Sequence, residues 1–225
     1  AGLLLEGPLE TRQAQYARTM QGSAVALLKV INDILDFSKI EAGRMDIELH
    51  PFDLRDCVES ALDLIASRAA EKHLDIAYVF ETNGAGEVPP VIDGDVTRLR
   101  QILLNLFSNA VKFTEAGEVV LTVRWEPAAL PSSGVGALGM LQFAVRDTGS
   151  GIPAAVRDRI FDPFFTTKAI GKGTGMGLSV VHGIVTAMGG AVHVYSEPDK
   201  GTQFQVYFPI EKNFFEEQAT HSNLK

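Results

Sequence analysis

The sequence contains a single cysteine, Cys57, among 225 residues. One cysteine cannot form an internal disulfide, and it cannot supply the several thiolates of a structural zinc site. Its neighbours Val58, Ala61 and Leu62 indicate the interior of a helix rather than a reactive thiol. The scarcity of cysteine fits a reducing compartment, so we expect a cytoplasmic location.

Long hydrophobic runs and an excess of basic residues are missing as well. No run approaches the roughly 18 apolar residues of a membrane-spanning helix, so we expect no membrane contact by this segment. The chain has 20 Lys and Arg against 28 Asp and Glu, and its formal net charge is −8. Because nucleic acids attract basic surfaces, this balance argues against a nucleic-acid partner. A content of 46% hydrophobic and 21% charged residues is typical of a globular protein.

Apolar residues at heptad spacing predict one long helix over residues 11–41. Their positions step alternately by four and three residues, at Met20, Ala24, Leu27, Ile31 and Ile34. A helix cannot bury such a stripe alone. Gly7-Pro8 indicates a turn after a short leucine run, so we expect a helical hairpin over residues 1–43 whose first helix is truncated. A solitary amphipathic helix that packs on its own domain is the alternative.

The rest of the chain mixes strands and helices. Asp53 and Asp95 are expected to cap two helices, because each precedes an apolar helical pattern. Strands are expected at residues 44–49, 74–80, 91–92, 118–125, 140–147, 191–196 and 203–208, with further helices at 154–160 and up to about residue 188. This order favours an α+β fold with helices layered on one face of a mixed sheet.

The segment Asp147–Pro153 has the pattern of a binding site. Asp147 follows residues 141–145, an apolar run with the length and β-branched content of a buried strand. Gly149 and Gly151 come next, and glycine allows unusual backbone angles and leaves no Cβ in the way of a ligand. A buried carboxylate needs a partner, for which a ligand amino group is one candidate. A plain turn with a solvated aspartate is the alternative.

Three polar residues share one face of the helix that follows Asp95. Asn105, Asn109 and Lys112 lie four and three residues apart, while Leu103 and Phe107 occupy the opposite face. An amide oxygen suits Mg²⁺, which takes few protein ligands besides phosphate and water, and a lysine offers a point charge to phosphate. The trio therefore suits a magnesium triphosphate. A solvated polar helix face is the alternative.

Residues 161–173 combine aromatics, threonines, lysines and glycines without periodicity. Such a segment can cover a nucleotide and open again, with Lys168 and Lys172 either near phosphate or simply solvated. Residues 173–177, Gly-Thr-Gly-Met-Gly, then open a helix, whose free backbone N–H groups form an anion site. A flexible loop with a glycine cap is the alternative. The sequence has no Walker A pattern.

Four stretches together resemble, in order and spacing, the N, G1, F and G2 boxes of histidine protein kinases: residues 105–114, 147–153, 161–167 and 171–179. The resemblance covers residues 3–209. It implies a Bergerat (GHKL) ATP-binding fold, an α/β sandwich with a mixed sheet, after a dimerisation hairpin that forms a four-helix bundle in a homodimer. ATP and Mg²⁺ are the implied cofactors. A response-regulator receiver domain is the implied partner, and the chain would belong to the cytoplasmic part of a sensor.

The resemblance also implies roles for single residues. Asn109 would be the Mg²⁺ ligand, and Asp147 would accept a hydrogen bond from the adenine amino group, supported by Thr202. Asn105 and Lys112 would be catalytic, the first positioning water or magnesium and the second contacting phosphate. The other implied nucleotide-binding positions are Gly149, Gly151, Ile152, Phe161, Phe165, Lys172, Gly173, Thr174, Gly175, Gly177 and Leu178. We expect an ATP-binding domain over residues 44–210 and a flexible tail over 211–225.

The chain departs from the family at the phosphoacceptor. The His-Glu-x-Arg-Thr-Pro stretch of the first helix is absent, and by the family pattern it would precede Ala1. The histidines present have other contexts and are expected to be structural or solvated: His50, His73, His182, His193 and His221. The implied function is transfer of the ATP γ-phosphoryl group to a bundle histidine, for relay to a response regulator. A nucleotide-binding dimerisation module without autokinase activity is the alternative.

Hydrolysis of ATP is a further rival reading of the same resemblance. Gyrase and heat-shock chaperone ATPases of this fold place a glutamate base where this chain has Asn105. An amide cannot take a proton from water, so hydrolysis is disfavoured.

Overall fold

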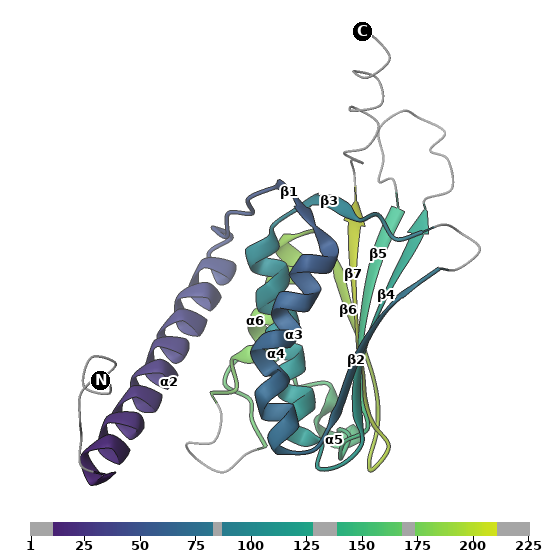
Figure 1. Cartoon of the computed structure of the whole chain (residues 1–225). Coiled ribbons are helices and arrows are strands. Elements are labelled where there is room, and N and C mark those ends of the chain that lie inside the picture. The colour runs from purple at the N-terminus through teal and green to yellow at the C-terminus, as the bar shows by residue number, and fades with distance from the viewer. Residues whose placement is uncertain (1–10, 83–86, 128–138, 168–173, 211–225) are drawn as a thin grey trace, which may run out of the picture.

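The computed structural model describes residues 11–82, 87–127, 139–167 and 174–210 (Figure 1). Several expectations lie outside the described residues: the first hairpin helix, the tail at 211–225, and Lys168, Lys172, Gly173 and His221. Among the described helices, none is long and apolar enough to cross a membrane.

A five-stranded mixed sheet is the centre of the fold (Figure 1). Its spatial order is β2 (Asp75–Glu81), β4 (Glu118–Pro127), β5 (Gly139–Asp147), β7 (Gly201–Ile210) and β6 (Ala191–Glu197). β2 and β4 pair in parallel, and the other neighbours pair antiparallel. The expected mixed sheet is thereby confirmed.

Three helices cover one face of this sheet: α3 (Leu54–Glu71), α4 (Val96–Phe113) and α6 (Gly177–Ala187). Leu103, Phe107 and Val111 of α4 are buried, as their spacing predicts, and they belong to the same core as Leu121 and Phe143 of the sheet. The α+β sandwich is thus held by one hydrophobic core between a helical layer and a sheet.

Both expected aspartate caps are confirmed. Asp53 accepts a hydrogen bond from Asp56 N at 2.9 Å, and Asp95 accepts one from Arg98 N at 3.0 Å. Each carboxylate satisfies an amide that has no partner within its own helix. Cys57, one turn into α3, is buried, and burial raises the pKa of its thiol to about 11, as a structural cysteine would show.

Two expected elements differ from the structure. Residues 44–49 are not a strand: Met45 and Ile47 are half-buried in alternation, but regular pairing begins only in β1 (His50–Asp53), which pairs antiparallel with β3 (Val91–Gly94). The helix expected at 154–160 is a single turn, α5 (Ala154–Arg157), after which the chain continues in turns that bury Ile160 in the core. At residues 44–49, alternating burial therefore belongs to a segment that connects α2 to β1 and does not pair as a strand.

Helix α2 (Thr11–Glu41) ends at the predicted residue and projects beside the sandwich (Figure 1). Its C-terminal end is anchored. Asp36 accepts from Arg98 Nη1 at 2.9 Å and from Gln101 Nε2 at 2.7 Å, both on α4. Ile40 packs so closely on Gly183 of α6 that an added Cβ would lie 2.6 Å from its side chain. Helices α4 and α6, on which the nucleotide site is expected, therefore both contact α2.

Candidate nucleotide-binding site

Asp147, the last residue of β5, is a buried carboxylate with an asymmetric environment. Its Oδ1 accepts from Gly149 N at 2.9 Å and from Thr202 N at 3.2 Å. Oδ2 accepts no hydrogen bond from the residues that the structure describes. Burial raises the pKa of Asp147, and the two amide hydrogen bonds oppose that rise. Oδ2 is thus available as a hydrogen-bond acceptor.

The turn after Asp147 rests on three other elements. Ser150 N donates to Phe113 O of α4 at 3.2 Å, and Thr148 N donates to Glu118 O of β4 at 3.2 Å. Asp199 N, in the β6–β7 turn, donates to Ser150 O at 2.9 Å. Backbone groups from distant parts of the chain therefore fix the position of the aspartate.

Thr202 and Ile152, both expected at the site, are linked by Ser196 of β6. Ser196 Oγ accepts from Ile152 N at 2.7 Å and lies 2.9 Å from Thr202 Oγ1. Sequence reasoning missed Ser196. The strand register that pairs it with Thr202 decides its role, and no motif marks it.

The polar face of α4 runs from buried to exposed. Asn105 is buried, Asn109 is half-buried and Lys112 is exposed. An added Cβ at Gly177 would lie 3.5 Å from Asn105 Oδ1, so the start of α6 faces the first asparagine of the trio. The trio thus forms a polar row that runs from beside the start of α6 to the protein surface.

The N-terminus of α6 has no side-chain cap. Met176 caps the helix without a side-chain hydrogen bond, and Met176 N itself donates to Thr174 Oγ1 at 3.2 Å. The first amides of an α-helix have no partner within the helix, and the helix dipole favours negative charge there. Leu178, in this first turn, packs on the core and holds the terminus in place.

The two expected phenylalanines pack rather than line an open space. Phe161 contacts the core, and its ring centroid lies 5.2 Å from that of His182. The guanidinium carbon of Arg159 lies 4.5 Å from the centroid of the Phe165 ring. Gly175 has φ +69°, and an added Cβ there would lie 2.5 Å from the Phe164 carbonyl carbon. The aromatic segment and the glycine loop are therefore packed against each other where the structure describes them.

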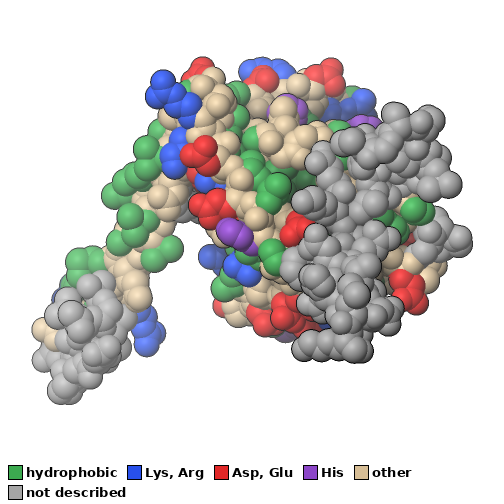
Figure 2. All heavy atoms as spheres, turned by 90° about the horizontal axis from the view of Figure 1, so that it is seen from above, with side chains coloured by type: hydrophobic (Ala, Val, Ile, Leu, Met, Phe, Trp, Pro, Cys, Tyr) green, Lys and Arg blue, Asp and Glu red, His purple; other side chains and the backbone are tan. Residues whose placement is uncertain are grey.

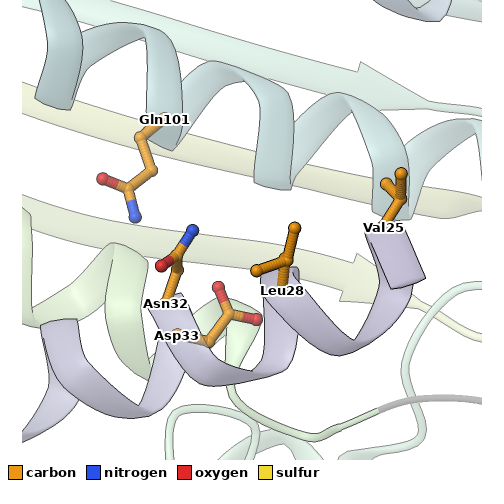
Figure 3. Close-up of a pocket in the computed structure, with 5 residues that line it drawn as sticks. All are labelled: Val25, Leu28, Asn32, Asp33 and Gln101. Atoms are coloured by element: carbon orange, nitrogen blue, oxygen red, sulfur yellow. The ribbon is translucent and has the colours of Figure 1, made fainter. Parts of the chain in front are cut away.

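A cavity of about 450 Å³ lies between α4 and α2. Asn105 lines it from α4, and Leu35, Asp36 and Lys39 line it from α2. A neighbouring cavity of about 370 Å³ continues along α2, where Asn32 and Gln101 project towards one another (Figure 3). Of the expected site residues, Asn105 is the one in the lining of the 450 Å³ cavity, which faces the long helix.

Comparison with known families agrees with this geometry. A family model described as "Histidine kinase-, DNA gyrase B-, and HSP90-like ATPase" matches residues 94–212. The chain belongs to this family. A "His Kinase A (phospho-acceptor) domain" model matches residues 1–43. The chain is therefore a histidine-kinase ATP-binding core preceded by part of a phospho-acceptor domain.

Curated relatives are longer histidine kinases. Hybrid signal transduction histidine kinase A of Dictyostelium discoideum is 38% identical over 92% of this chain and 10% of its own length. BarA, a signal transduction histidine-protein kinase of Escherichia coli (strain K12), is 36% identical over 94% of this chain and 22% of its own length. The chain thus spans less than a quarter of these two relatives.

Solved structures share the fold. Full-length ShkA in complex with AMPPNP superimposes with a TM-score of 0.75, at 36% identity, over 94% of this chain and 42% of ShkA. The Acinetobacter baumannii histidine kinase AdeS has the same fold at 19% identity and a TM-score of 0.66. The expected GHKL ATPase fold is confirmed.

Proposed function

We propose that this ATPase-family core binds ATP with Mg²⁺ and transfers the γ-phosphoryl group to a histidine on a dimerisation bundle. The Asp147 carboxylate carries the proposal: two backbone amides occupy Oδ1, which leaves Oδ2 to accept from the adenine amino group. Such an arrangement favours a purine with an exocyclic amine over one with a carbonyl. ShkA, which is 36% identical, was solved with AMPPNP.

The phosphate end is proposed on α4 and α6. The uncapped amides of α6 would bind phosphate oxygens, Lys112 would add a positive charge, and Asn109 would ligate Mg²⁺. Asn105 would position the metal or its water. The metal ion, when bound, would neutralise charge that develops on the phosphoryl oxygens.

The chemistry needs no nucleophile from this domain. A nitrogen of the acceptor imidazole attacks the γ-phosphorus, the bond to the β–γ bridging oxygen breaks, and ADP leaves with the electron pair. The imidazole N–H proton passes to solvent. Positioning and electrostatic stabilisation dominate such transfers, and the residues at this site supply both.

We also propose that α2 dimerises. Its seam residues Met20, Leu27, Ile31 and Ile34 are 53%, 61%, 43% and 41% exposed, and Figure 2 shows hydrophobic side chains along the projecting arm. Unpaired heptad stripes of this kind mark helix–helix interfaces. The hairpin would span residues 1–43 and the ATP-binding domain 44–210. A receiver domain of a response regulator would take the phosphoryl group, within the cytoplasmic part of a sensor.

Incubation with γ-labelled ATP and a separate histidine-containing dimerisation bundle tests the function. Transfer predicts label on the bundle that is stable to base and lost in acid, and a bundle with its histidine replaced by glutamine is the control. ATP binding without any transfer would instead favour the nucleotide-binding dimerisation module without autokinase activity.

A further inference from the structure

Lys72, the residue that ends α3, reaches across to the end of α4. Its ammonium nitrogen lies 3.1 Å from Lys112 O, 3.0 Å from Thr114 O and 3.3 Å from Glu115 Oε1. An ammonium group has three N–H donors, and here each has an acceptor. The hydrogen bond to Thr114 O is partly buried, whereas those to Lys112 O and Glu115 Oε1 are exposed.

These two carbonyls flank Phe113, the last residue of α4. The carbonyl of Phe113 accepts from Ser150 N at 3.2 Å, and an added Cβ at Gly149 would lie 2.5 Å from it. The turn that follows Asp147 therefore rests directly on the Phe113 peptide. Lys72 holds Phe113 in place because it donates to the carbonyl of the residue before it, Lys112, and to that of the residue after it, Thr114.

We propose that Lys72 is a positioning residue for nucleotide binding, which it serves by holding the Phe113 peptide under the Asp147 turn; this rests on the proposed function. Lys112 and Asn109 lie in the same last two turns of α4. Lys72 therefore holds the end of α4, which contacts the turn after Asp147 and carries the proposed phosphate-binding residues. Its positive charge also suits the negative end of the α4 dipole.

A purely stabilising helix cap makes a different prediction. A cap raises the free energy of unfolding but leaves the nucleotide affinity of the folded protein unchanged. A positioning residue alters the folded site itself. Affinity and local backbone protection, measured on folded protein, therefore separate the two roles.

The test compares wild type, Lys72→Met, Lys72→Arg and Glu115→Gln. Titration with AMPPNP and Mg²⁺ gives the dissociation constant, and NMR hydrogen exchange without nucleotide gives the protection of the Ser150 amide. We expect Lys72→Met to raise the dissociation constant about tenfold, since hydrogen bonds from a charged donor are lost. Its Ser150 amide should exchange about tenfold faster. Lys72→Arg keeps the charge and several donors, so it should recover most of both losses.

Glu115→Gln removes the ion pair and leaves the carbonyl contacts, so it should behave as wild type in both measurements. Arg68→Met, which removes a positive charge from an exposed position on α3, controls for the change in net charge. Should Lys72→Met fail to fold, Lys72→Gln, which keeps two N–H donors without the charge, takes its place.

The inference is overturned if Lys72→Met melts at a lower temperature but keeps wild-type affinity and wild-type exchange at Ser150. It is equally overturned if Glu115→Gln reproduces the losses of Lys72→Met. Failure of the wild type to bind AMPPNP would contradict the proposed function alone, because Ser150 exchange still decides whether Lys72 holds the turn.

Discussion

Replacement of Asp147 by asparagine changes one atom of the candidate site and reverses its hydrogen-bonding character. The amides of Gly149 and Thr202 both donate to Oδ1, so the amide oxygen of Asp147→Asn must occupy that position. The side-chain NH2 group then takes the place of Oδ2. A donor would face the adenine amino group, which is itself a donor, and the recognition hydrogen bond would be lost.

The expected cost follows from that single contact. Loss of a hydrogen bond at a buried site costs about 1–3 kcal/mol, or roughly a 10- to 100-fold increase in the dissociation constant for ATP. The fold should survive, because volume and both Oδ1 contacts are kept. Burial raises the pKa of Asp147, which means that the folded protein disfavours the carboxylate, so a neutral amide should not destabilise it.

Calorimetric titration with ATP and Mg²⁺, paired with thermal melting, measures both quantities. Asp63→Asn is the matched control, because it removes the same charge from an exposed position on α3. An Asp147→Asn protein that folds normally and binds ATP with wild-type affinity would refute the assignment of Asp147 to adenine.

The same reasoning predicts a pH dependence. The folded pKa of Asp147 is raised, so protonation begins at a higher pH than for an ordinary aspartate. Protonated Asp147 presents an O–H donor at Oδ2, much as asparagine presents N–H. Wild-type affinity should therefore fall towards that of Asp147→Asn as pH decreases through this pKa, and the ratio of the two dissociation constants should approach one. A ratio that stays constant with pH would contradict the role of Oδ2.

Three further changes test other parts of the molecule. Asn109→Ala should remove the proposed Mg²⁺ ligand and weaken ATP binding by at least about tenfold, with a smaller loss when titrations omit Mg²⁺. Gly151→Ala should lower the free energy of unfolding by about 2 kcal/mol or more in urea denaturation, since Gly151 has φ +67° and an added Cβ would lie 2.0 Å from Glu197 O. Ile31→Asp should convert a dimer to a monomer in sedimentation analysis, because it places a charge in the exposed seam of α2. An Asn109→Ala protein whose ATP affinity depends on Mg²⁺ as much as that of the wild type would contradict the first prediction. Unchanged stability of Gly151→Ala would contradict the second, and an intact Ile31→Asp dimer would contradict the third.

Local patterns in the sequence predicted the helices well. The heptad spacing predicted α2 and the residue at which it ends, and Asp53 and Asp95 cap α3 and α4 as their positions indicate. These signals lie within a few residues of the feature they predict. The parallel pairing of β2 with β4 joins Asp75 to Glu118, far apart in the chain, and nothing local to either residue indicates it.

The residues that hold the candidate site in place were not indicated by the sequence. The resemblance to histidine kinases identified Asp147 and Thr202, and the structure brings them into hydrogen-bond contact. Ser196 and Lys72 were not anticipated. Ser196 acts through a strand register, and Lys72 acts on backbone carbonyls, which every residue possesses. Roles of this kind have no residue-type signature in a single sequence.

The glycines show where sequence reasoning needs the structure most. A glycine at a binding site can leave room for a ligand, or it can be required by the protein's own packing. At Gly149, Gly151 and Gly175 an added Cβ would lie 2.5, 2.0 and 2.5 Å from backbone atoms of this chain, so packing alone requires these three glycines. At Gly177 the nearest atom would be Asn105 Oδ1, at an ordinary 3.5 Å. Gly177 is therefore the glycine of this set whose missing side chain leaves space beside the α6 amides, where the phosphates are proposed to bind.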